Sequence, residues 1–99
     1  MQINIIYWRD IPSQVSVQKG RRSAKLLLEQ RFQEAIDQAA MRSGAHESDA
    51  YLQDWRRVLL GNYDGDLQTL ADAKAAELEA SIGETELSAL VKNNGWKEA

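Results

Sequence analysis

Hydrophobic and polar residues alternate along the first third of the chain, and this pattern predicts β-strands. Residues 3–8 (INIIYW) are rich in β-branched and aromatic side chains, and both faces of the predicted strand are largely apolar. We therefore expect this strand to be central or covered on both sides. Val15 and Val17 alternate with polar residues and predict a half-buried second strand, followed by a turn at Gly20. Residues 23–28 predict a third strand, although their three leucines fit the opening of a helix equally well.

Beyond residue 28 the apolar positions repeat every three or four residues, which predicts helices. Gly44 lies where a left-handed C-cap would end the first helix. Ser48 and Asp66 are suitable N-caps for the second and third helices. The predicted helices cover residues 29–43, 48–59, 66–82 and 84–93.

These patterns together predict an α+β fold in which a small antiparallel sheet of two or three strands, over residues 2–28, packs against the helices. We expect residues 1–99 to form a single domain, with residues 60–99 as a helical extension that packs less densely. The helix at 66–82 has a narrow apolar stripe and needs support from the domain, a partner or a second copy. Trp96 is buried only if the C-terminal segment docks on the domain or on a partner. The predicted buried residues are Ile3, Ile5, Val15, Leu28, Phe32, Ile36, Leu52, Trp55 and Val58.

The composition excludes several classes of protein. The 99 residues include no cysteine and one histidine, His46, which excludes disulfides, thiolate metal sites, cysteine nucleophiles and multi-histidine metal sites within one chain. No apolar run is long enough to span a bilayer, and the N-terminal pattern differs from that of a secretory signal. We therefore expect a cytoplasmic protein that does not act at a membrane.

Charge is unevenly distributed along the chain. Residues 1–44 carry seven basic and four acidic residues, whereas residues 45–99 carry five basic and eleven acidic residues. Electrostatic fields of opposite sign on the two halves can steer a partner toward the chain, or one copy of the chain toward another. A homo-oligomer is therefore one possible assembly. The whole chain has a net charge of −3, which disfavours nucleic acid as a partner.

Residues that carry chemistry are sparse. Residues 46–49 (HESD) hold one imidazole and two carboxylates, but a transition-metal site usually needs more than one imidazole, so we interpret them as a polar loop with a helix cap. Asn62, Asp64 and Asp66 alternate as at the start of a calcium loop, but the glycine and glutamate that such a loop requires are missing. No serine has a hydrolase motif, and no glycines form a phosphate-binding motif. We therefore predict that the chain is not an enzyme and has no catalytic residue, metal or cofactor.

The predicted binding site combines two features. Trp8, Arg9 and Asp10 place an aromatic side chain beside charges of both signs, an arrangement that suits an interface hot spot, although Trp8 fits a core position equally well. The second feature is a cluster of cations around the predicted turn, which fits partner docking or an ordinary solvated hairpin. The predicted partner-binding residues are Trp8, Arg9, Asp10, Lys19, Arg21, Arg22 and Lys25.

Three blocks of sequence resemble one known family. They are residues 7–15 (YWRDIPSQV), residues 31–41 (RFQEAID, then AM) and residues 48–56 (SDAYLQDWR). In this order they are similar to a small bacterial family of virulence-factor domains, with a related domain in conserved virulence factor C beside HEAT-type repeats. The resemblance covers about residues 3–58 and brings no catalytic residue with it. It implies an accessory or scaffolding role, and free-standing members of the family resemble proteins encoded near folate- and corrinoid-dependent one-carbon enzymes.

Two functions follow as hypotheses. The first is a non-catalytic accessory or adaptor subunit that binds a larger cytoplasmic protein, for which a folate- or corrinoid-linked one-carbon enzyme is a candidate. The alternative is a stand-alone small-ligand-binding protein or minor enzyme that uses the Arg9/Asp10 and Arg21/Arg22 region. The lack of a convincing acid–base pair or nucleophile favours the first.

Overall fold

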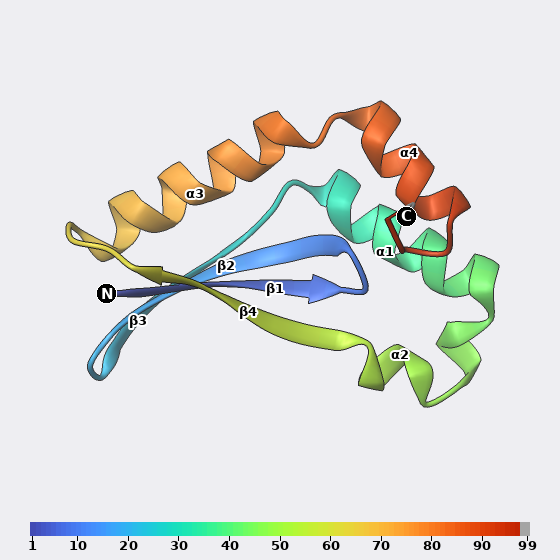
Figure 1. Ribbon diagram of the computed structural model, residues 1–99, viewed down its shortest axis with the longest axis horizontal. Coiled ribbons are helices and arrows are strands. Elements are labelled where there is room, and N and C mark those ends of the chain that lie inside the picture. Colours follow the sequence, from blue (N-terminus) through green and yellow to red (C-terminus); the bar gives the residue numbers. More distant parts are fainter. Residues whose placement is uncertain (98–99) are drawn as a thin grey trace.

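The chain folds as a four-stranded antiparallel sheet with helices packed around it, as the computed structural model in Figure 1 shows. The structure describes residues 1–97. The strands are β1 (Gln2–Trp8), β2 (Ile11–Lys19), β3 (Arg22–Leu27) and β4 (Trp55–Asn62). The helices are α1 (Gln30–Ser43), α2 (Ala50–Gln53), α3 (Leu67–Ser81) and α4 (Glu84–Lys92), with a 3-10 turn, η1, at Ala45–Glu47. The predicted α+β class is confirmed, but the sheet has four strands rather than two or three.

The strand order is β3-β2-β1-β4, and every neighbouring pair is antiparallel. β1 therefore lies inside the sheet, as its two apolar faces predict. The turn between β2 and β3 contains Gly20 with a φ of +59°, a left-handed conformation that glycine adopts without strain. Residues 22–27 form the third strand, so the three leucines do not open the first helix.

The predicted helix over residues 48–59 is wrong. Only Ala50–Gln53 is α-helical there, and the chain continues as β4, which pairs with the second edge of β1. Apolar residues at helical spacing suggested the helix, but the strands of residues 2–28 cover only one edge of β1. Pairing such as Val58 opposite Ile5 satisfies backbone groups of β1 that would otherwise lack partners. Ser48 does not begin the next helix but ends η1.

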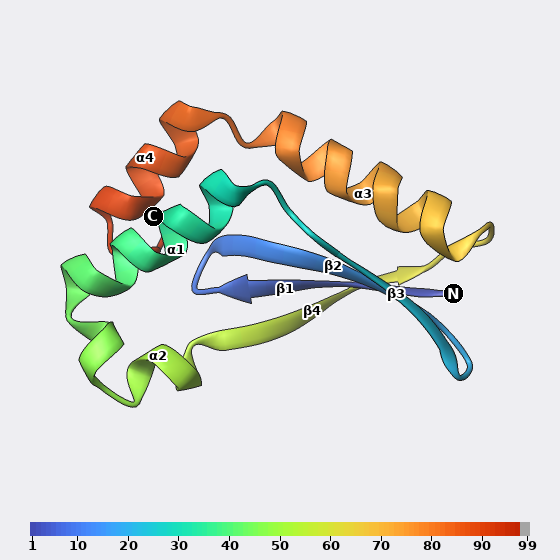
Figure 2. The same cartoon turned by 180° about the vertical axis from the view of Figure 1, so that it is seen from behind.

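The helices are divided between two parts of the sheet. α3 lies over β2 and β3, whereas α1 and α4 pack against each other near the end where β1 and β2 meet, as Figures 1 and 2 show. The predicted helix ends are confirmed at Gly44, which caps α1 with a φ of +75°, and at Asp66, whose carboxylate accepts a hydrogen bond from the Thr69 N–H. None of the helices in residues 1–97 is long and apolar enough to cross a membrane.

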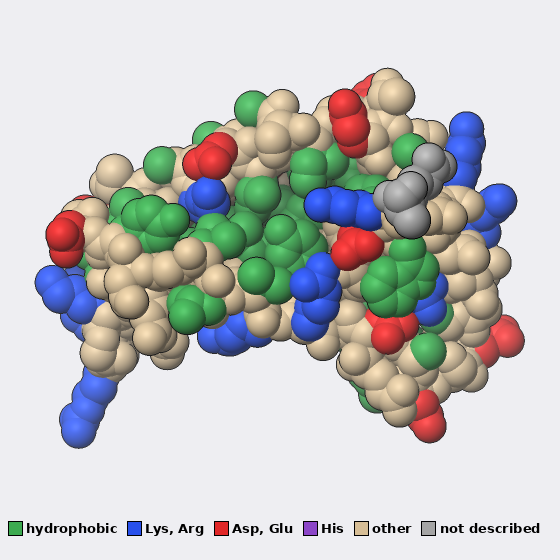
Figure 3. All heavy atoms as spheres, in the orientation of Figure 1, with side chains coloured by type: hydrophobic (Ala, Val, Ile, Leu, Met, Phe, Trp, Pro, Cys, Tyr) green, Lys and Arg blue, Asp and Glu red, His purple; other side chains and the backbone are tan. Residues whose placement is uncertain are grey.

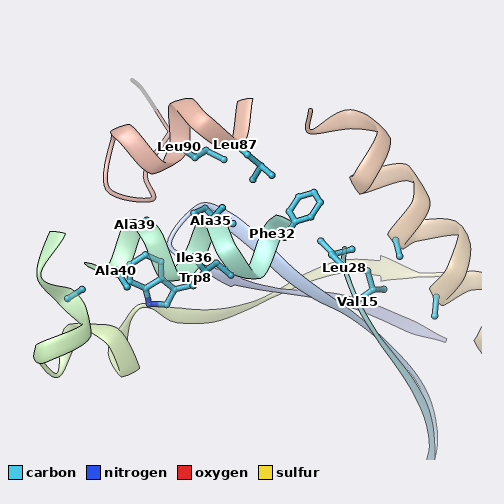
Figure 4. Packing of buried hydrophobic residues seen from close by; sticks show 14 of the residues in the cluster. Trp8, Val15, Leu28, Phe32, Ala35, Ile36, Ala39, Ala40, Leu87 and Leu90 are labelled. Carbon is cyan, nitrogen blue, oxygen red and sulfur yellow. The ribbon is translucent and has the colours of Figure 1, made fainter. Parts of the chain in front are cut away.

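An apolar core joins the sheet to α1, α3 and α4 (Figure 4). Phe32 and Ile36 on α1 are fully buried, and Leu87 and Leu90 reach the same cluster from α4. Each large side chain buried in this way stabilises the fold by about 1.5–3 kcal/mol relative to exposure. Leu52 is 74% exposed, so its predicted burial is wrong: it lies on the single turn of α2, which contributes no buried residue. Burial is confirmed for Ile3, Ile5, Val15, Leu28, Phe32 and Ile36, whereas Trp55 and Val58 are half-buried.

Candidate functional site

The turn between β1 and β2 brings distant parts of the chain together. Arg9 has a φ of +55°, which is uncommon for a residue with a side chain. Its N–H donates to the Asp54 carbonyl at 3.0 Å, and the next N–H, of Asp10, donates to the Gly95 carbonyl at 2.8 Å. These bonds connect the turn to the start of β4 and to the C-terminal segment, and they explain how a strained conformation is maintained.

Trp8 is buried rather than exposed. Its side chain lies beneath α1 near Ala39 and Ala40, and none of its surface is accessible (Figure 4). The indole N–H donates to the Tyr51 carbonyl at 3.0 Å, so the polar edge of the ring is also satisfied inside the fold. The interpretation of Trp8 as an exposed anchor is therefore wrong, and the core alternative holds.

Arg9 uses its guanidinium for contacts within the chain. The side chain is 10% exposed and donates to the Asp54 carboxylate at 2.9 Å and to the Asn94 carbonyl at 2.6 Å. It also lies over the Trp8 ring at 4.5 Å and the Trp96 ring at 5.4 Å, within the range of cation–π attraction. The arginine therefore links the end of β1 to the C-terminal segment.

Asp10 completes this link. Its two carboxylate oxygens accept separate bonds, one from the Arg56 guanidinium at 3.0 Å and one from the Lys97 N–H at 2.7 Å. Gly95 lies so close to β1 that a Cβ atom added there would come within 3.0 Å of the Trp8 ring. We call residues 93–97 the C-terminal strap, because the end of β1 and the following turn hold them against the domain.

The four cations of the β2–β3 hairpin have a different environment. Lys19, Arg21, Arg22 and Lys25 are all exposed, and none of them forms an ion pair within the described residues. Figure 3 shows Lys and Arg side chains projecting at the end of the molecule where this hairpin lies. We call these four residues the basic hairpin. They present positive charge to solvent on a two-stranded projection.

The two features of the predicted site lie at opposite ends of the sheet. β1 and β2 pair from Trp8 opposite Ile11 to Gln2 opposite Gln18, so the Arg9–Asp10 turn and the basic hairpin are separated by the length of a strand, about 20 Å. The structure therefore does not bring the seven predicted residues into one contact surface. It also separates the Arg9/Asp10 pair from the Arg21/Arg22 pair, which the alternative small-ligand hypothesis treated as one region.

The strap is the feature that sequence reasoning missed. The sequence analysis predicted that Trp96 is buried only if the C-terminal segment docks on the domain or on a partner. Trp96 does dock on the domain, where it is 45% exposed and stacks on Arg9. Asn94 and Gly95 have positive φ values of 61° and 94°, so the Asn-Gly pair was the available signal for a chain reversal. No cluster of three or more metal-ligating side chains occurs in residues 1–97.

Comparison with known families identifies the chain. Residues 6–91 match the family described as virulence factor. The chain belongs to this family. The match extends through β4, α3 and most of α4, well past the residues on which the sequence resemblance rested. No curated protein and no solved structure matches this virulence-factor domain significantly.

Proposed function

We propose that this virulence-factor domain is a non-catalytic accessory subunit that binds a larger cytoplasmic protein through its basic hairpin. The observation that carries the proposal is the state of the four cations on the hairpin. Among the described residues they are exposed and without ion-pair partners, whereas Arg9 and Arg56 are used within the fold. The basic hairpin is therefore a cluster of exposed cations, without ion-pair partners among the described residues, that is free to contact another molecule.

The geometry of the hairpin suits docking. Lys19 and Arg22 pair across the end of the β2–β3 ladder, so the backbone fixes the spacing of the charges without help from a partner. Gly20 has open space around it, which leaves the turn accessible. Arginine and lysine presented in this way complement carboxylates on a protein surface, and the guanidinium can bind a carboxylate through two hydrogen bonds.

The charge cluster defines the chemistry of the partner. We expect an acidic surface, because four cations within seven residues attract negative charge over about one Debye length, 8–10 Å at physiological salt. Charges at the rim of an interface mainly accelerate association and set orientation, with a strong dependence on salt. We name a folate- or corrinoid-linked one-carbon enzyme as the candidate partner, on the basis of the family resemblance.

The proposal is tested by affinity purification from the native host. The wild-type chain is compared with the Arg21→Glu/Arg22→Glu variant and with a matched control, Arg57→Glu/Lys92→Glu, in which two exposed cations away from the hairpin are reversed. We expect a specific acidic protein to co-purify with wild type and control but not with the hairpin variant. Thermal unfolding should show similar midpoints for all three, because the altered side chains are exposed.

Two results would contradict the proposal. Equal recovery of the same protein with the hairpin variant would remove the hairpin from the contact. Loss of the protein in both variants would show that only net charge is recognised. If the proteins that depend on the hairpin for recovery include another acidic protein but no one-carbon enzyme, the hairpin contact is supported and the one-carbon enzyme is excluded as the partner.

A further inference from the structure

A groove lies between α3, α4 and the end of β1, next to the strap. Its volume is about 560 Å³, within the range of roughly 300–1,000 Å³ found for small-molecule sites. Leu78 and Ile82 form one wall, Leu90 forms another, and the rings of Tyr7 and Trp96 are also part of its lining. Figure 3 shows hydrophobic side chains gathered in a hollow at the centre of this face, with charged groups at one end.

The charges around the groove balance. Asp10, Glu86 and Lys97 line it, and Arg56 binds the Asp10 carboxylate from beside Tyr7. Arg56 neutralises Asp10 from outside the lining, and Glu86 and Lys97 carry opposite charges, so the charges of the described residues at the groove sum to zero. Both oxygens of Asp10 already accept hydrogen bonds within the fold, so this carboxylate does not need a cation from a ligand.

We infer that the groove is a binding site for a small, uncharged, ring-bearing apolar molecule. The walls offer aliphatic surface together with two aromatic rings, which favour stacking or edge contacts with a ring of the ligand. The balanced charges favour an uncharged molecule, because a charged one would have to leave water beside a group of its own sign. The inference does not rest on the proposed function, because the hairpin lies at the other end of the sheet.

The strap gives the groove one of its walls. Trp96 is held by Arg9, and its position depends on the bonds that Asp10 makes to the strap. A ligand that contacts Trp96 would therefore bind more tightly to the chain with its strap docked. By linkage it would stabilise that arrangement in return.

The test uses Nile red, an uncharged fluorescent probe with fused rings, titrated with the full chain. Ala89 is exposed on α4 and lines the groove, so Ala89→Phe fills the space without disturbing the core. Ala76→Phe places the same ring on an exposed position of α3 outside the groove and serves as the control. We expect saturable binding to wild type and to Ala76→Phe, and at least tenfold weaker binding to Ala89→Phe. The anionic probe anilinonaphthalene sulfonate should bind at least tenfold more weakly than Nile red.

A second readout locates the probe. In a ¹⁵N spectrum of the three indole N–H groups, that of Trp96 should shift on saturation while that of Trp8 stays in place. Absence of saturable binding, or equal binding by Ala89→Phe and wild type, would overturn the inference. A dimer in light scattering that dissociates in Ala89→Phe would show that a second copy fills the groove, and would also overturn it.

Discussion

Trp8, Arg9 and Asp10 stand out in the sequence for their chemistry, and the structure shows that they act within the chain. Each contacts at least one segment more than 40 residues away, through Tyr51, Asp54 or the strap. The sequence predicted that these residues make specific contacts, but it could not show whether those contacts lie within the chain or with another protein. An aromatic residue beside charged residues gives the same sequence pattern whether these side chains contact each other inside the fold or form an interface with a partner.

Replacing Trp8 measures how much the buried indole contributes to the stability of the fold. We expect Trp8→Ala to lower the free energy of unfolding by about 3–5 kcal/mol, because it removes a fully buried ring. Trp8→Phe should cost less, because it keeps a ring and removes only part of the volume and the hydrogen bond to the Tyr51 carbonyl. Urea unfolding followed by circular dichroism provides the measurement. A Trp8→Ala variant as stable as wild type would show that the indole is not part of the core.

Gly95→Ala tests the close approach of the strap. The added Cβ would lie 3.0 Å from the Trp8 ring and 3.1 Å from Arg9 Cδ, at a φ of +94° that alanine adopts only with strain. We expect a loss of about 2 kcal/mol in the free energy of unfolding. Gly20→Ala is the control, because its φ is also positive but no atom lies within 4 Å of the added Cβ. Equal losses for the two variants would mean that backbone strain alone, and not the contact with Trp8, accounts for the effect.

The cap of α3 makes stability depend on pH. The backbone N–H and the hydroxyl of Thr69 donate to Asp66 and hold its pKa below the usual value, with a smaller contribution from Arg22. A carboxyl whose pKa is lower in the folded chain stabilises the fold above its unfolded pKa, about pH 4, and loses that contribution as pH falls through the folded pKa. Asp66→Asn should therefore lower the thermal midpoint at pH 7, and the difference from wild type should shrink toward pH 2. A difference that is constant with pH would exclude this linkage.

At the scale of elements, most of the fold follows from local patterns, and β4 is the exception. Period-two alternation predicted β1 and β2, the period of three to four predicted α1, and Asp66 predicted the start of α3. β4 carries apolar residues at positions that also suit a helix, so local sequence did not distinguish the two. The deciding interaction is pairing with β1, which lies about 50 residues earlier in the chain. The two apolar faces of β1 indicated a central strand, which needs a neighbour on each side.

The two long helices, α1 and α3, differ in how much apolar side-chain surface they bury. α1 buries Phe32, Ile36 and three alanines, whereas Ala71 and Ala75 are the buried residues of α3. Small side chains bring α3 close to the sheet but remove less apolar surface from water. We expect amide hydrogens near the centre of α3 to exchange faster than those near the centre of α1 in the free protein. Hydrogen exchange followed by NMR measures this directly, and equal protection of the two helices would contradict it.

At the scale of the whole molecule, the two proposed binding surfaces lie toward opposite ends. The basic hairpin lies at one end, and the strap with its adjacent groove lies toward the other, in a molecule whose longest dimension is 40 Å. The sequence located the hairpin correctly, because Gly20 and the cations that flank it lie within a few residues of one another along the chain. The groove could not be predicted in the same way, because its lining residues come from β1, α3, α4 and the strap. Only the tertiary fold brings them together.

Hydrogen–deuterium exchange of the domain, free and bound to the partner identified by affinity purification, decides whether the basic hairpin is the contact surface. We expect binding to increase protection across the basic hairpin, residues 18–26, and to leave residues 7–10 and the strap unchanged. The hairpin cations are exposed and unpaired in the described chain, whereas Trp8, Arg9 and Asp10 are already engaged. Added protection at residues 7–10 with none at the hairpin would contradict binding through the hairpin and place the contact at the other end of the sheet.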